Sequence, residues 1–132
     1  MQYSLTHRTG AMSQLNTDIG ANAVIKLFSG TVPATCGTAD SGTALVTFAG
    51  NATAFGSAAS QVLTASAVAN ASASATGTAG YFRIYPSAAT TTNAVVHGTC
   101  GLSATDMILT NTSITSGQTV SFTSLTVTAF GI

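Results

Sequence analysis

The side chains that could carry out chemistry are few and widely separated in this sequence. Those best suited to proton transfer, nucleophilic attack or metal binding are three aspartates, two histidines and two cysteines: Asp18, Asp40, Asp106, His7, His97, Cys36 and Cys100. A calcium loop needs several oxygen ligands close together, and a zinc site needs more cysteines or histidines near each other. The sequence therefore predicts no catalytic residue, no cofactor and no metal ligand, and we expect a protein that is not an enzyme.

A serine hydrolase triad could be assembled only from His97, Asp106 and one of the 15 serines. With so many serines this coincidence is easily reached, and no Gly-x-Ser-x-Gly turn is present to expose a nucleophile. We instead interpret Asp40 and Asp106 as turn or capping residues, which accept hydrogen bonds from nearby backbone N–H groups. We interpret His97 as a residue near a strand end with a backbone partner.

Each cysteine lies in a Thr-Cys-Gly triplet, at Cys36 and Cys100. A disulfide between them would close a long loop and add about 4 kcal/mol of stability by the chain-entropy model. Unpaired thiols are the rule in a reducing cytosol. We favour unpaired thiols on these grounds, although the sequence leaves the pairing open.

The segment Tyr81-Phe82-Arg83-Ile84-Tyr85 is the most suggestive candidate for a contact with another molecule. In a strand, Tyr81, Arg83 and Tyr85 share one face, and Phe82 and Ile84 share the other. Tyrosine and arginine are enriched at protein interfaces and stack on sugars, which predicts a protein-contact patch at these three residues. An ordinary strand with amphipathic side chains on its outer face explains the pattern equally well.

Only six formal charges sit on 132 residues, and the net charge is zero. Three cations, Arg8, Lys26 and Arg83, cannot neutralise the phosphates of a useful nucleic-acid site, so we expect no nucleic-acid partner. The first ten residues lack the apolar region of a signal peptide, and no apolar run approaches the ~18 residues of a membrane span. A surface so poor in charge is typical of one covered by other subunits, and this reading is favoured over a surface solvated by hydroxyl groups alone.

These residues must be positioned by a short helix followed by strands. Apolar positions at Ala11, Met12, Leu15 and Ile19 predict a helix over 8–19, which Gly20 ends and which an arm, 1–7, precedes. Alternating polar and apolar residues then predict strands over these ranges: 23–28, 43–49, 61–66, 71–76, 80–85, 94–98, about 106–110, and 118–129. For 65–79 a strand pair is favoured over a low-complexity linker, because the alternation is kept.

In the last predicted strand, Val120 and Phe122 share one face, but Leu125 and Val127 restore the apolar face only if the alternation shifts by one residue. A β-bulge near Thr123-Ser124 would produce this shift, as would a strand that crosses between two sheets. Short strands with regular turn signals indicate an all-β fold, an antiparallel β-sandwich of jelly-roll type with one short N-terminal helix. We expect one domain over 1–132.

The sequence also resembles a known family. The resemblance is carried after Gly20, most specifically by Gly77-Thr78-Ala79-Gly80-Tyr81-Phe82-Arg83 and by Asn111-Thr112-Ser113-Ile114-Thr115-Ser116-Gly117-Gln118. These stretches are similar to small virion proteins of tailed bacteriophages, several of which are capsid cement, or decoration, proteins with a jelly-roll fold. No catalytic motif comes with the resemblance, and it says nothing about the two cysteines.

The resemblance implies a structural virion protein, made in the bacterial host cytoplasm and bound to the outer capsid surface. There it would bridge neighbouring major capsid proteins, its principal partners. The alternative is a receptor- or glycan-binding module of a phage fibre or head appendage, with Tyr81, Arg83 and Tyr85 as its contact face. We also expect a homo-oligomer, because exposed strand edges invite pairing and twofold dimers are the commonest closed assembly. A dimer is favoured over a trimer.

Overall fold

The N-terminal helix is one turn longer than the sequence pattern indicates. The computed structural model describes residues 2–49, 55–65 and 68–129, and within them α1 spans Leu5–Ile19. Ser4 caps its start, because the Ser4 hydroxyl accepts a hydrogen bond from the His7 backbone N–H at 3.2 Å. Gly20, at φ 72°, ends the helix where predicted. The predicted boundary at residue 8 is therefore wrong, and the last part of the expected arm, residues 5–7, belongs to the first turn of α1.

The rest of the described chain is mostly strand. The strands are β1 (Val24–Ser29), β2 (Ala44–Ala49), β3 (Val62–Thr64), β4 (Ala71–Ser72), β5 (Gly77–Tyr85), β6 (Val96–Gly101), β7 (Met107–Leu109), β8 (Ser113–Ile114), β9 (Thr119–Val120) and β10 (Phe122–Thr128). The predicted strands all have a counterpart, but those over 61–66 and 71–76 are much shorter than expected. The strand β8 was not expected, and the predicted final strand is interrupted at Ser121.

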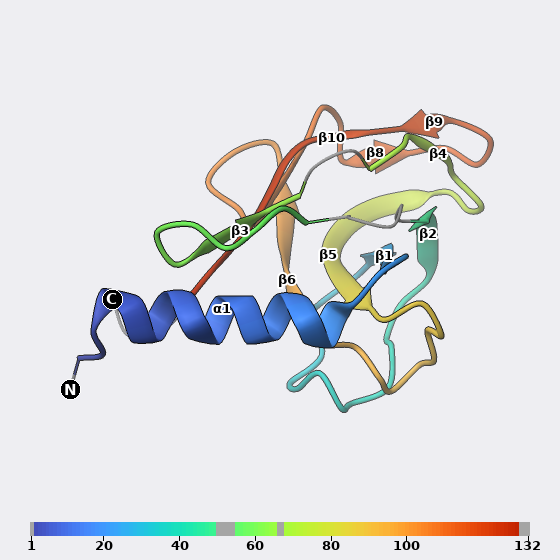
Figure 1. The fold of residues 1–132 in the computed structure, drawn as a ribbon. Coiled ribbons are helices and arrows are strands. Elements are labelled where there is room, and N and C mark those ends of the chain that lie inside the picture. Colours follow the sequence, from blue (N-terminus) through green and yellow to red (C-terminus); the bar gives the residue numbers. More distant parts are fainter. Residues whose placement is uncertain (1, 50–54, 66–67, 130–132) are drawn as a thin grey trace.

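One curled sheet carries most of these strands. Its order is β2-β1-β5-β6-β7-β10-β3, with β8 paired to β5, and a separate small pair joins β4 to β9. Figure 1 shows this sheet curling around, with α1 running along one side below the ends of β6 and β10. The sheet is mixed, because β6 and β7 pair in parallel through Cys100↔Met107 and Gly101↔Ile108. The prediction of a fully antiparallel sheet is therefore wrong at this pair, where loop 102–106 returns the chain to run beside β6 in the same direction.

The bulge predicted in the last strand is confirmed. Phe122 lies opposite Leu109 and Ser124 lies opposite Ile108, so Thr123 is the extra residue between them. This extra residue lets Leu125 point into the core, where it is fully buried.

The core lies inside the curl of the sheet. It joins side chains of α1, such as Met12 and Ile19, to side chains of the strands, such as Ile25, Phe48 and Phe82. Alternate residues of β1, Ile25 and Leu27, enter it, as the period of a strand requires. In β2 the consecutive residues Leu45 and Val46 are both part of it. This packing fixes α1 against the sheet and thereby sets the shape of the surface between α1, β6 and β10.

Candidate functional site

The predicted contact residues Tyr81, Arg83 and Tyr85 do share one face of β5, but that face is covered. All three side chains are 0% exposed. The prediction that they form an outward contact patch is therefore wrong, because residues 35–41 and Thr91 fold over them. In this arrangement the three residues bind the protein's own loop.

Arg83 is the centre of this buried cluster. One of its terminal nitrogens, Nη1, donates to Asp40 Oδ1 at 2.8 Å and to the Thr38 carbonyl at 2.8 Å. The other, Nη2, donates to the Thr35 carbonyl at 2.9 Å. The guanidinium group thus holds the loop after β1 in place through several fixed donors. Asp40 is not the turn or capping residue that the sequence suggested, since its carboxylate serves Arg83 and Tyr85.

The two tyrosines complete the cluster. The Tyr85 hydroxyl donates to Asp40 Oδ1, and the Tyr81 hydroxyl donates to the Ser41 carbonyl. Burial, together with the neighbouring Asp40 carboxylate, raises the pKa of Tyr85 far above its ordinary value. Lys26 lies 5.2 Å from the centre of the Tyr85 ring. We name the group formed by Asp40, Tyr81, Arg83 and Tyr85 the Arg83 cluster.

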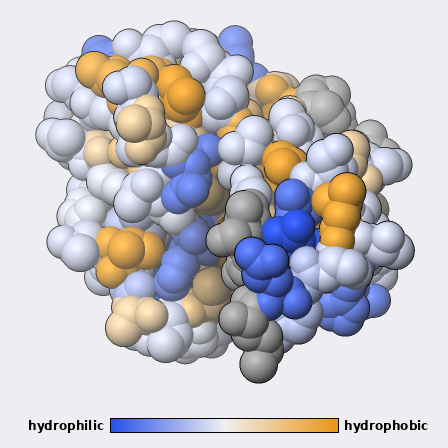
Figure 2. All heavy atoms as spheres, turned by 90° about the vertical axis from the view of Figure 1, so that its left-hand side faces the viewer, coloured by the Kyte–Doolittle hydropathy of each residue, from blue (hydrophilic) through white to orange (hydrophobic). Residues whose placement is uncertain are grey.

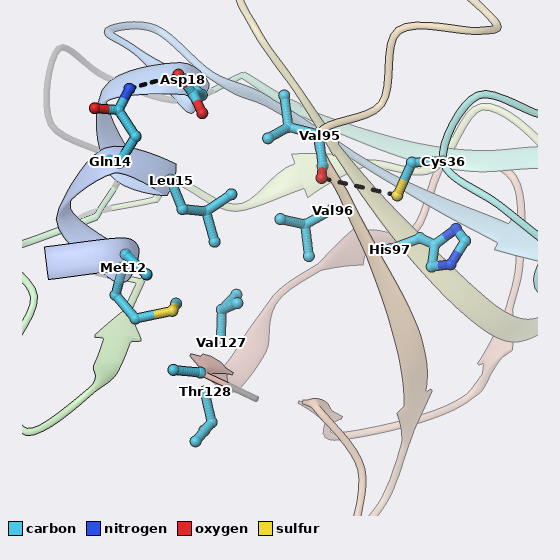
Figure 3. A pocket seen from close by; sticks show the side chains of 12 residues that line it. Met12, Gln14, Leu15, Asp18, Cys36, Val95, Val96, His97, Val127 and Thr128 are labelled. Carbon is cyan, nitrogen blue, oxygen red and sulfur yellow. Dashed lines mark hydrogen bonds between the residues drawn. The ribbon is translucent and has the colours of Figure 1, made fainter. Parts of the chain in front are cut away.

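A groove lies on another part of the surface, between α1 and the ends of β6 and β10. Its volume is about 510 Å³. Figure 3 shows Leu15 of α1, Val96 of β6 and Val127 of β10 pointing toward one another across it, with Asp18 at the α1 side and Cys36 and His97 beyond β6. The groove is mainly apolar, and the sequence analysis did not find it because it joins three elements that are distant in the chain.

A second hollow of about 250 Å³ continues the groove between β6 and β10. The two hollows share Val96, His97, Val127 and Thr128. We call the space bounded by residues 96–99 and 126–128 the β6–β10 opening. Figure 1 shows the two strands separating as they approach α1.

Asp106 closes one end of the β6–β10 opening. Its carboxylate Oδ2 accepts a hydrogen bond from the Thr99 backbone N–H at 3.1 Å, which confirms its interpretation as a capping residue. Its own carbonyl accepts a hydrogen bond from the Thr126 backbone N–H at 3.2 Å. Asp106 thus joins β6 to β10 where no strand lies between them.

His97 lines both hollows. Its Nδ1 atom is buried and has no hydrogen bond within the described residues, so the expected backbone partner is not found. Burial lowers the pKa of His97, and the positive charge of Arg83 lowers it further. Its imidazole is therefore neutral at neutral pH.

The two cysteines are unpaired, as the sequence analysis favoured. The Cys36 thiol is half-buried and lies 3.7 Å from the Val95 carbonyl oxygen. Cys100 is buried, and burial raises its pKa to about 11, which leaves the thiol protonated and unreactive at neutral pH. Within residues 2–49, 55–65 and 68–129, no three His, Cys, Asp or Glu side chains lie close enough together to hold a metal ion.

The exterior carries very little charge. Arg83 and Asp40 neutralise each other inside, with 0% and 12% of their side chains exposed. Of the other four charged residues, Arg8 and Lys26 are half-buried, and Asp18 and Asp106 are exposed. Figure 2 shows a face that is largely of intermediate hydropathy, with scattered apolar patches and a furrow between two raised parts.

Comparisons with known proteins add no relative. No family model, no curated protein and no solved structure matched the chain. Among the described residues, no helix is long and apolar enough to cross a membrane.

Proposed function

We propose that this chain is a structural virion protein that binds the outer surface of a bacteriophage capsid and bridges neighbouring major capsid proteins. The observation that carries the proposal is the exterior, which has two exposed charges, two half-buried ones and many threonines and serines. A surface of this kind loses little hydration free energy when another protein covers it, because burying an unpaired charge is what makes most surfaces costly to cover. The resemblance of the sequence to cement proteins supports the same role.

The Arg83 cluster suits this role because it stiffens the fold from inside. A loop that would otherwise be mobile is tied to β5 by charge-assisted hydrogen bonds from Arg83. A protein that resists strain across a seam between capsid subunits needs such stiffness and needs no catalytic group. We therefore propose a role without enzymatic activity, and we regard the curled mixed sheet as a variant of the jelly roll.

We also propose that the protein acts as a homo-oligomer on the capsid, with a dimer favoured over a trimer. One end strand of the main sheet, β2, is covered on its outer edge by Ser74 at Leu45, whereas segment 55–59 bonds the outer edge of the other end strand, β3. Edge-to-edge contact of two copies about a twofold axis would cover the rest of the β2 edge.

Particles assembled with and without the protein test the proposal. Capsids lacking it should form with normal geometry but release their DNA at a lower temperature, because each site adds a small contact and many copies act together. Adding the purified protein back should restore the heat resistance. Equal heat and osmotic resistance of the two kinds of particle would overturn the cement role.

The alternative role, a receptor- or glycan-binding module, loses the feature that suggested it. That role used Tyr81, Arg83 and Tyr85 as the contact face, and all three are buried. Copy number separates the two roles, because a cement protein is present in hundreds of copies per particle and a fibre protein in few.

A further inference from the structure

The β6–β10 opening has the geometry of a strand position that no described strand fills. Pairing of β6 with β7 is limited to Cys100 and Gly101, and β10 pairs with β7 only from Phe122 to Leu125. Beyond these pairs, residues 96–99 and 126–128 face each other across the 250 Å³ hollow.

Backbone groups of both strands point into the opening. The Thr99 N–H points away from β5 toward Asp106. Backbone groups alternate in direction along a strand, so the N–H and C=O of His97 point the same way. On the other side, Thr126 N–H bonds Asp106, whereas Leu125 C=O and Ala129 N–H bond residues on the β3 side. The same alternation directs the N–H and C=O of Thr128 into the opening.

The walls of the opening and of the adjoining groove define what could bind there. Leu15, Val96 and Val127 make the walls apolar, and Asp18 and Asp106 place a carboxylate at two of the edges. No lysine or arginine lines either hollow in the described part of the chain. Arg8 lines a smaller neighbouring hollow of about 110 Å³ beyond Ala129. The charged side chains that line the groove and the opening are therefore both acidic.

We propose that the β6–β10 opening binds one extended peptide segment of a partner protein by strand addition, the segment presenting apolar side chains on one face and carrying a lysine or arginine. The backbone groups of His97 and Thr128 supply the hydrogen bonds, and the valines supply the side-chain contacts. Asp18 and Asp106 select the basic residue by charge complementarity. The proposal does not depend on the capsid role, because such an opening would serve any partner with a segment of this kind.

The probe for this test is the synthetic peptide acetyl-Thr-Val-Thr-Val-Lys-amide, titrated into isotopically labelled full-length protein. We expect backbone amide NMR signals of His97 and Thr128 to shift with saturation. Methylating the backbone nitrogen of the central threonine should weaken binding about tenfold or more, because a buried backbone acceptor then loses its donor. Replacing the lysine of the probe with glutamate should abolish the shifts.

Two conservative variants test the charge selection. Asp106→Asn and Asp18→Asn keep the hydrogen-bond acceptors that hold Thr99 and Gln14. Each should weaken binding of the lysine probe by about twofold to fivefold, the range of an exposed ion pair. The control Lys26→Gln removes a charge on β1, two strands from β6, that lines neither hollow, and it should leave the affinity unchanged.

Unshifted His97 and Thr128 signals at millimolar peptide would overturn the proposal, as would equal binding of the methylated and unmethylated probes. If these signals instead shift with protein concentration alone, and sedimentation shows a dimer, the opening belongs to a second copy of this chain and the proposal is wrong. Neither result bears on the heat resistance of particles, so the capsid role stands or falls separately.

Discussion

Arg83 is the residue that most changes the interpretation of this chain. It is one of three cations, and it is fully buried with its charge neutralised by Asp40. A buried guanidinium group stays charged, so its removal leaves the Asp40 carboxylate without a cation and the Thr38 carbonyl without its Arg83 donor. The loop after β1 then loses its charge-assisted hydrogen bonds to β5.

Arg83→Met should lower the free energy of unfolding by about 3–5 kcal/mol, because Asp40 is left nearly buried without a cation. The double variant Arg83→Met with Asp40→Asn should recover part of the loss. Urea unfolding followed by circular dichroism measures both.

Lys26→Met is the matched control for the Arg83 substitution. Lys26 is a half-buried cation on the neighbouring strand β1, and its ammonium group lies 5.2 Å from the centre of the Tyr85 ring. Its loss should cost at most about 1 kcal/mol, the range of a cation–π contact. Equal costs for the two substitutions would contradict a central role for Arg83.

His97 should make the stability fall in mild acid. In the unfolded chain its pKa returns to about 6.5, whereas in the fold burial and Arg83 hold the pKa lower. The stabilisation from a neutral His97 is therefore complete above about pH 6.5 and is lost as the pH falls through the folded pKa. Unfolding free energies at about pH 7.5 and about pH 5 should differ less for His97→Gln than for the unmodified protein.

At the scale of the elements, close approach of loop 102–106 to β6 is what holds the β6–β10 opening in shape. A Cβ atom at Gly98 would lie 2.7 Å from Asp106 Oδ2 and 2.9 Å from the Phe82 ring. A side chain at position 98 would therefore displace the Asp106 carboxylate or the Phe82 ring, and glycine at this position leaves both in place.

Gly98→Ala should destabilise the protein by about 1–3 kcal/mol, the usual cost of overpacking. Gly10→Ala is the matched control, because a Cβ atom there meets nothing within 4 Å and the residue lies in α1. That change should stabilise the protein by about 0.5–1 kcal/mol. Thermal unfolding of the two variants measures whether each substitution raises or lowers the stability. A stabilising Gly98→Ala would show that the contact with Asp106 is not tight.

The elements themselves were largely predictable from local patterns. The helical stripe ending at Gly20, the alternation in β1, β2 and β5, and the bulge at Thr123 all follow from spacing within a few residues. The parallel pair of β6 and β7 and the short strand β8 were not predicted, because pairing partners and chain direction are set by contacts between distant segments.

The candidate site was predictable only in part, for the same reason. The alternation correctly placed Tyr81, Arg83 and Tyr85 on one face of a strand. Their burial depends on Asp40, which is 43 positions away in a loop rich in threonine and glycine that carries no periodic signal. In a chain with so few charged residues, an arginine within a strand needs one of the three aspartates as its partner. That need was the one clue in the sequence to the pairing of Arg83 with Asp40.

At the scale of the whole molecule, the sparse exterior charge sets how the protein should associate. Electrostatic attraction between surfaces weakens as salt shortens the screening length from about 10 Å at 0.1 M to about 3 Å at 1 M. A surface on which Asp18 and Asp106 are the two exposed charged residues has little such attraction to lose.

Binding of the protein to capsids that lack it should therefore change by less than about twofold between about 0.1 M and about 1 M sodium chloride. Co-sedimentation with the particles measures the bound fraction. A loss of tenfold or more would mean that charged residues of the capsid dominate the contact, which would contradict an interface formed mainly by uncharged groups.

The β6–β7 pair also bears on how the molecule comes apart. In the described chain, the ladders that join the half-sheet β2-β1-β5-β6 to the later strands are short, with two residue pairs of β6 with β7 and two of β5 with β8. A few further hydrogen bonds supplement them, such as that from the Thr99 N–H to Asp106 and that from the Ser74 N–H to the Leu45 carbonyl. Slow exchange of backbone amide hydrogens should therefore divide the protein into two cooperative units, with the β10–β3 ladder opening before the ladder of β1, β2 and β5. The particle would then hold together a protein whose two halves separate more readily when it is free.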